Sequence, residues 1–125
     1  MGLGIYIKGL EHEKSYHSGY IRFMQYRMII AKLYNERIGE LYEKNRLYPL
    51  LKEEEEEWNK LCNDDLDIFL WHSDCDGKLT VKECRKVYKI LKQYKIEEFP
   101  FNELHEKFLN NLKFAIDNRR NMYFV

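Results

Sequence analysis

The stretch "TVKECRKVYKILKQY", Thr80 to Tyr94, decides the fold class. Its apolar residues recur at steps of three and four, which is the period of a helix that buries one face. Thr80 and Glu83 also stand in the T-x-x-E spacing of a capping box, in which each side chain accepts a hydrogen bond from a free backbone amide. The sequence therefore predicts a helix that begins near Thr80. Its expected inner stripe is Cys84, Val87, Tyr88, Leu91 and Tyr94.

The run that overlaps the start of this helix, "HSDCDGKLTVKEC", His72 to Cys84, suggests metal chemistry. A calcium-binding EF-hand loop needs oxygen ligands on alternate residues, a glycine at the sixth place and a bidentate glutamate at the twelfth. With Gly77 at the sixth place, the first place holds His72, and imidazole nitrogen is a poor ligand for a hard cation. We therefore expect at most weak binding of Ca²⁺. The candidate metal ligands are Asp74, Asp76, the Lys78 carbonyl, Thr80 and Glu83.

Two interpretations of this loop stay open, and the sequence favours the second. In the first, the loop holds a divalent cation. In the second, Asp74, Asp76 and Gly77 are ordinary turn residues that lead into a capped helix. A zinc site built from His72, Cys75 and Cys84 is less favoured, because it offers three ligands and Cys84 falls on the inner stripe.

The remaining elements complete a mainly α (α+β) expectation. Residues 3–7 alternate between apolar and other side chains, as a strand with one buried face does. Residues 122–125 form a second strand that can pair with the first, after a turn over 117–121. We predict one domain over residues 1–125, with helices that begin near Ser18, Pro49, Thr80 and Asn102 around a two-stranded sheet of the chain termini. The expected core includes Phe23, Ile30, Trp58, Leu61, Phe69, Val87, Leu91, Phe108 and Leu112.

Composition limits the classes of function. The 125 residues suffice for one core, and 21 basic residues against 21 acidic ones leave no net charge to attract a phosphate backbone. No apolar run approaches the roughly 18 residues of a membrane span. Three cysteines do not make a disulfide framework, which favours a reducing compartment. We therefore expect a cytoplasmic protein without a nucleic-acid or membrane partner.

A second group of polar residues lies in "EHEKSYHSGYIRF", Glu11 to Phe23. An enzyme would use His17 as a general base and Arg22 as an anion clamp, and His72 could join them in one pocket. The alternative function is accordingly a small hydrolase or a nucleotide-binding enzyme. No nucleophile motif or glycine-rich phosphate loop supports it, so the sequence favours a non-enzymatic accessory protein. Such a protein could use exposed tyrosines to bind an unknown protein partner.

Three stretches together resemble a known family. "MGLGIYIK", "SYHSGYIRF" and "HSDCDGKLTVKEC" are similar to small bacterial and phage proteins that open "MGLDIY" and carry an "HSDCDG" block. The family has no assigned activity, so the resemblance implies a bacterial or prophage setting and no mechanism. This chain has Gly4 where the family commonly has aspartate, which would weaken any site that uses that carboxylate. His72, in contrast, matches the family block.

Overall fold

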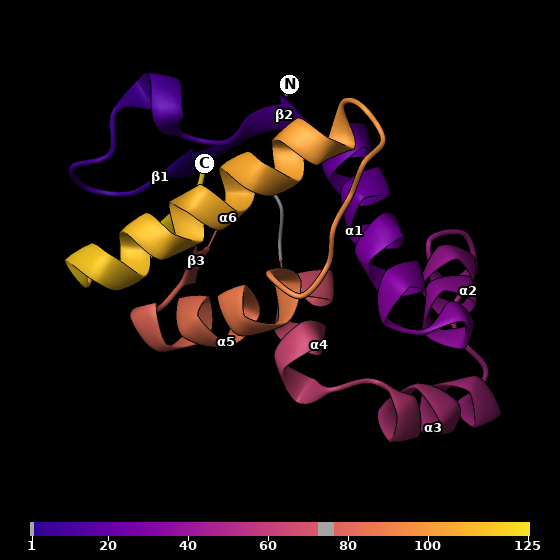
Figure 1. Cartoon of the computed structure of the whole chain (residues 1–125). Coiled ribbons are helices and arrows are strands. Elements are labelled where there is room, and N and C mark those ends of the chain that lie inside the picture. The colour runs from indigo at the N-terminus through magenta and orange to yellow at the C-terminus, as the bar shows by residue number, and fades with distance from the viewer. Residues whose placement is uncertain (1, 73–76) are drawn as a thin grey trace.

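The computed structural model describes residues 2–72 and 77–125 and is mostly helical, at 62% (Figure 1). The helices are α1 (Tyr20–Tyr34), α2 (Glu36–Asn45), α3 (Lys52–Leu61), α4 (Asp64–Trp71), α5 (Val81–Leu91) and α6 (Phe101–Asn118), with a short 3₁₀ helix η1 (His12–Lys14). The strands are β1 (Gly2–Tyr6), β2 (His17–Gly19), β3 (Lys78–Leu79) and β4 (Met122–Phe124). No helix in the described ranges is long and apolar enough to cross a bilayer.

The strands form one antiparallel sheet in the order β2-β1-β4-β3. The predicted pairing of the chain ends is confirmed, because Ile5 lies opposite Phe124. The prediction of only two strands is wrong, since β2 and β3 add one strand at each edge. These edge strands have three and two residues, too few to show an alternating pattern. Backbone pairing with the terminal strands makes them part of the sheet.

The two faces of the sheet differ. One face is buried beneath helices, and Figure 1 shows α6 passing in front of the strands. The other face is exposed and carries Tyr6, Tyr123 and Lys78. This division follows from the period of two along each strand, which sends successive side chains to opposite faces. The strand residues of the buried face are Leu3, Ile5, Leu79, Met122 and Phe124.

Phe23 lies at the centre of an aromatic core. The centroid of its ring is 5.7 to 6.2 Å from the centroids of five other buried rings. These rings belong to Tyr16, Tyr26, Phe69, Phe108 and Phe124. Of the nine core residues we predicted, eight are buried, and Leu61 is the exception at 37% exposure. Leu61 is the last residue of α3, and the chain leaves the core there.

Several helix boundaries differ from the predicted ones. Ser18 lies in β2 and gives α1 no cap, since Gly19 holds the N-cap position. Pro49 lies before α3, which begins at Lys52. Helix α6 continues to Asn118, into the predicted turn. Helix α4 was not predicted, because its eight residues are too few to establish a helical period.

Candidate functional site

The described part of the predicted metal loop is held by its own hydrogen bonds. Thr80 Oγ1 accepts from the Glu83 amide at 3.2 Å, and Glu83 Oε1 accepts from the Thr80 amide at 3.0 Å, which confirms the capping box. The third described candidate ligand, the Lys78 carbonyl, accepts a hydrogen bond from His72 Nε2 at 2.8 Å. Asp74 and Asp76 lie outside the described residues. Among the described residues, there is no group of three or more His, Cys, Asp or Glu side chains that could hold a metal ion.

His72 closes the two ends of this loop. Its ring spans from the end of α4 to β3 and packs on Phe124, with the ring centroids 4.4 Å apart. Gly77 has the positive φ of 89° that a glycine tolerates, as predicted for the turn. Where an EF-hand loop has a ligand at the first place, this chain has a side chain that bonds directly to the seventh place. The imidazole therefore makes the connection that an ion makes in a calcium loop.

The thiol expected for the zinc alternative is part of the core. Cys84 is fully buried, and burial raises its pKa to about 12. Its Sγ donates to the Leu79 carbonyl at 3.8 Å. A thiol held neutral in this way is a poor zinc ligand, because zinc binds the thiolate. Cys75, the other thiol of that alternative, lies outside the described residues.

In the part of the chain that the structure describes, the three candidate catalytic residues line two different hollows. His17 and Arg22 line a surface hollow of about 360 Å³ near the start of α1, whereas His72 lines a different one. His17 Nδ1 donates to the Ser15 carbonyl at 2.8 Å, and Ser18 Oγ donates to the Tyr16 hydroxyl at 3.0 Å. Among the described residues, Ser18 is therefore not hydrogen-bonded to a base, as an activated nucleophile is.

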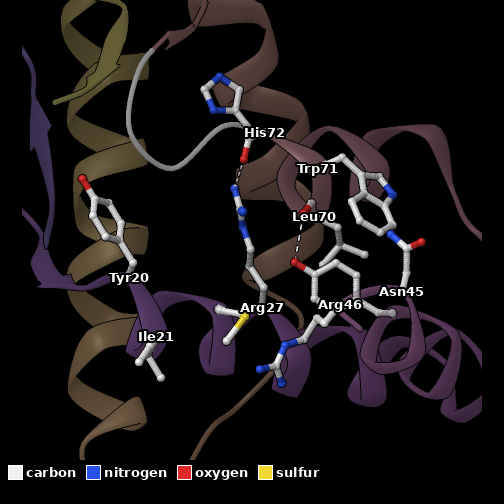
Figure 2. A pocket seen from close by; sticks show the side chains of 10 residues that line it. Tyr20, Ile21, Arg27, Asn45, Arg46, Leu70, Trp71 and His72 are labelled. Atoms are coloured by element: carbon white, nitrogen blue, oxygen red, sulfur yellow. Dashed lines mark hydrogen bonds between the residues drawn. The ribbon is translucent and has the colours of Figure 1, made fainter. Parts of the chain in front are cut away.

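The hollow that contains His72 also has a volume of about 360 Å³ and lies between α1, the end of α2 and the end of α4 (Figure 2). Arg27 crosses it and donates from Nη2 to the His72 carbonyl. In the same hollow, the Tyr42 hydroxyl donates to the Leu70 carbonyl at 3.0 Å. These two bonds fix the end of α4 against α1 and α2. The lining residues are Tyr20, Ile21, Met24, Arg27, Tyr42, Asn45, Arg46, Leu70, Trp71 and His72.

Trp71 stands at the border between this hollow and a second one. Its ring packs on Tyr42 and Trp58 at 5.0 and 5.3 Å, yet 43% of the residue is exposed. Asn45 and Trp71 line both hollows, and Leu50 lines the second. The connection between α2 and α3, which supplies Arg46 to the first hollow and Leu50 to the second, also exposes Leu47, Tyr48 and Leu51. We call Arg46, Leu47, Tyr48, Leu51 and Trp71 the Trp71 surface.

The charges around Trp71 are unequal on its two sides. Arg46 lines the first hollow and forms no ion pair with any described residue; its Nη1 points to Met28 Sδ at 3.3 Å. The second hollow carries Glu55 and Asp67 instead. Asp67 Oδ1 accepts a hydrogen bond from Trp58 Nε1 at 2.9 Å. The cation without a described carboxylate partner, Arg46, therefore lies on the side of the first hollow.

Sequence reasoning missed the Trp71 surface. The five residues come from two segments that are some twenty residues apart, and neither segment has an amphipathic period. The sequence contained one usable signal, the cluster of large apolar residues in the connection between α2 and α3. Connections usually lie on the surface, so apolar residues that gather in one indicate an exposed apolar patch.

Comparison of the chain with protein-family models, with curated proteins and with solved structures found no match. The resemblance to the family that opens "MGLDIY" therefore stays a prediction.

Proposed function

We propose that this protein is a non-enzymatic accessory protein that binds a segment of a partner protein on the Trp71 surface. The observation that carries the proposal is Trp71 itself. An indole that is packed on two aromatic rings and still 43% exposed offers a large rigid contact area between two hollows. Trp, Tyr and Arg are enriched among the few residues that dominate the binding energy of protein interfaces, and they make up five of the ten residues that line the first hollow.

The chemistry of the surface indicates the kind of segment it binds. Leu47, Tyr48 and Leu51 are each at least 60% exposed and favour an apolar segment. Arg46 has no described carboxylate partner and favours an acidic residue beside the apolar ones. The expected ligand is therefore an apolar peptide segment with at least one carboxylate.

No specific observation favours the enzyme alternative. His17 and Arg22 share a hollow, but Ser18 bonds to Tyr16 and His72 lines a separate hollow. We assign a structural role to the described residues of the His72 to Glu83 segment, in which His72 bonds to the Lys78 carbonyl and Thr80 and Glu83 cap α5. We further propose a cytoplasmic, bacterial or prophage setting, which agrees with the free thiols of Cys62 and Cys84.

The test is a selection of random phage-displayed peptides on the purified chain, followed by calorimetry with the enriched peptides. We expect peptides that combine aromatic or aliphatic residues with Asp or Glu. Binding should weaken at least about tenfold in Trp71→Ala, since a central aromatic anchor typically contributes that much. Arg46→Glu should weaken it as well by placing like charges together.

Phe99→Ala is the matched control, because Phe99 is 71% exposed and lines neither hollow. It should bind the selected peptides as the unmodified chain does. Trp71 packs on two other rings, so Arg46→Glu serves as the variant that leaves the packing intact. Selected peptides that bind both variants as tightly as the unmodified chain contradict the proposal, and so does a selection that enriches none.

A further inference from the structure

The exposed face of the sheet carries aromatic rings and cations together. Tyr6 of β1 lies directly opposite Tyr123 of β4, and Tyr123 lies opposite Lys78 of β3. The three side chains therefore form one row across three strands. Tyr6 is 53% and Tyr123 39% exposed, and their ring centroids are 6.3 Å apart. The two tyrosines stand on the two central strands of the sheet.

Basic side chains surround this row. A hollow of about 430 Å³ is bounded by the two tyrosines together with Lys8, Arg119 and Arg120. With Lys78, four exposed cations therefore gather at one face. The ion pairs of the described chain all involve other cations. We call these six residues, Tyr6, Lys8, Lys78, Arg119, Arg120 and Tyr123, the tyrosine platform.

A purely structural role accounts for only part of the platform. Arg119 and Arg120 follow α6, and cations at a helix C-terminus interact favourably with the helix dipole. Neither Lys8 nor Lys78 lies at the end of a helix, so the dipole does not explain them. The dipole also gives no reason for two exposed rings side by side, where polar residues are common on an exposed sheet face.

We propose that the tyrosine platform binds single-stranded nucleic acid. Unpaired bases stack on exposed aromatic side chains, and Lys and Arg beside them bind the phosphates. Two rings on neighbouring strands provide stacking positions for two bases, and the flanking cations follow the backbone. An acidic peptide would satisfy the cations but would leave the two rings without a planar partner. The proposal shares no residue with the Trp71 surface and does not depend on it.

The cations of the tyrosine platform bear on the expectation, drawn from net charge, that the protein has no nucleic-acid partner. Equal numbers of acidic and basic residues over the whole chain do not prevent a local excess. The fold brings Lys8 to one hollow with Arg119 and Arg120 and places Lys78 opposite Tyr123 on the same face, although more than one hundred residues separate Lys8 from Arg120. This face therefore carries four exposed cations, while the whole chain has no net formal charge.

The experiment is fluorescence anisotropy with a labelled oligodeoxythymidine of about eight nucleotides, which suits a small stacking site. We expect binding that weakens between about 50 and 200 mM salt, as the release of counterions requires. Tyr6→Leu and Tyr123→Leu should each weaken it about tenfold, because each removes one stacking ring and keeps an apolar side chain on the strand. Arg120→Glu should weaken it and flatten the salt dependence.

Phe99→Leu is the matched control, because Phe99 is 71% exposed and belongs to neither the tyrosine platform nor the Trp71 surface, and it should bind as the unmodified chain does. Three outcomes overturn the proposal. The first is no binding at about 50 mM salt. The second is binding that neither platform tyrosine affects. The third is equal binding of a duplex of the same length or of a labelled oligoglutamate, either of which would show that charge alone is recognised.

Discussion

His105 is a buried residue whose charge state affects the stability of the fold. Its Nε2 donates to the Tyr94 carbonyl at 2.9 Å, so in the neutral ring Nδ1 accepts from the Tyr26 hydroxyl at 2.6 Å. Burial lowers the pKa of His105, and the hydrogen bond to the Tyr94 carbonyl opposes that effect in part. The folded chain therefore favours the neutral imidazole.

The lowered pKa predicts a loss of stability in acid. Below the unfolded pKa of about 6.5, the unfolded chain binds a proton at His105 that the folded chain resists. The contribution of His105 is therefore complete above that pH and is lost as the pH falls through the folded pKa. Urea unfolding between pH 7 and 5 should show a smaller decline of the unfolding free energy in His105→Gln than in the unmodified chain. Equal declines in both would contradict this assignment.

At the scale of single elements, the start of α5 is the clearest case of a helix end that is stabilised by capping side chains. The capping box satisfies two backbone amides, and both members were named from the T-x-x-E spacing alone. Thr80→Ala should lower the free energy of unfolding by about 1 kcal/mol. Glu83→Gln should cost little, because glutamine also serves in a capping box. Chemical denaturation of both variants checks the pair, and a larger cost for Glu83→Gln would show that the carboxylate charge has another role.

The same element gives a prediction about calcium. Glu83 Oε1, Thr80 Oγ1 and the Lys78 carbonyl are already engaged within the chain, and the first place of the loop holds an imidazole. We therefore expect no heat on titration with calcium up to about 1 mM, the weak end of calcium affinities in proteins. Heat that disappears in Glu83→Gln would show instead that an ion recruits this carboxylate.

At the scale of the whole molecule, the aromatic core joins the sheet to the helices. Phe23 of α1 contacts rings from α4, α6 and β4, and the Arg27 guanidinium lies 4.5 Å above its ring. Phe23→Ala should lower the free energy of unfolding by about 3 to 5 kcal/mol, because several elements would have to collapse together to fill the cavity. The exposed Phe99→Ala should change it by no more than about 0.5 kcal/mol. Denaturant unfolding of both variants makes the comparison. A small cost at Phe23 would mean that the core is packed differently.

Parts of the fold with a local cause were predictable from the sequence. The capped helix after Thr80, the pairing of the two chain ends and eight of nine core residues follow from spacing and periodicity. The edge strands β2 and β3 were not predictable, because backbone partners from distant segments create them. Helix α4 was not predicted because it is short. The N-cap residue Asn63, whose side chain accepts a hydrogen bond from the Asp65 amide, was the sequence signal for its start.

The sequence by itself determined that the chain forms helices around paired chain ends and that a capped helix follows Thr80. Those features depend on residues that are close in the sequence, because helix capping and hydrophobic periodicity act over a few residues. Only the tertiary structure decided which side chains meet. It separated His72 from His17 and Arg22, left Trp71 between two hollows, and gathered Tyr6 and Tyr123 with four cations on one sheet face. Such groupings depend on packing between segments that are distant in the sequence. A local sequence pattern does not show which of these segments pack together.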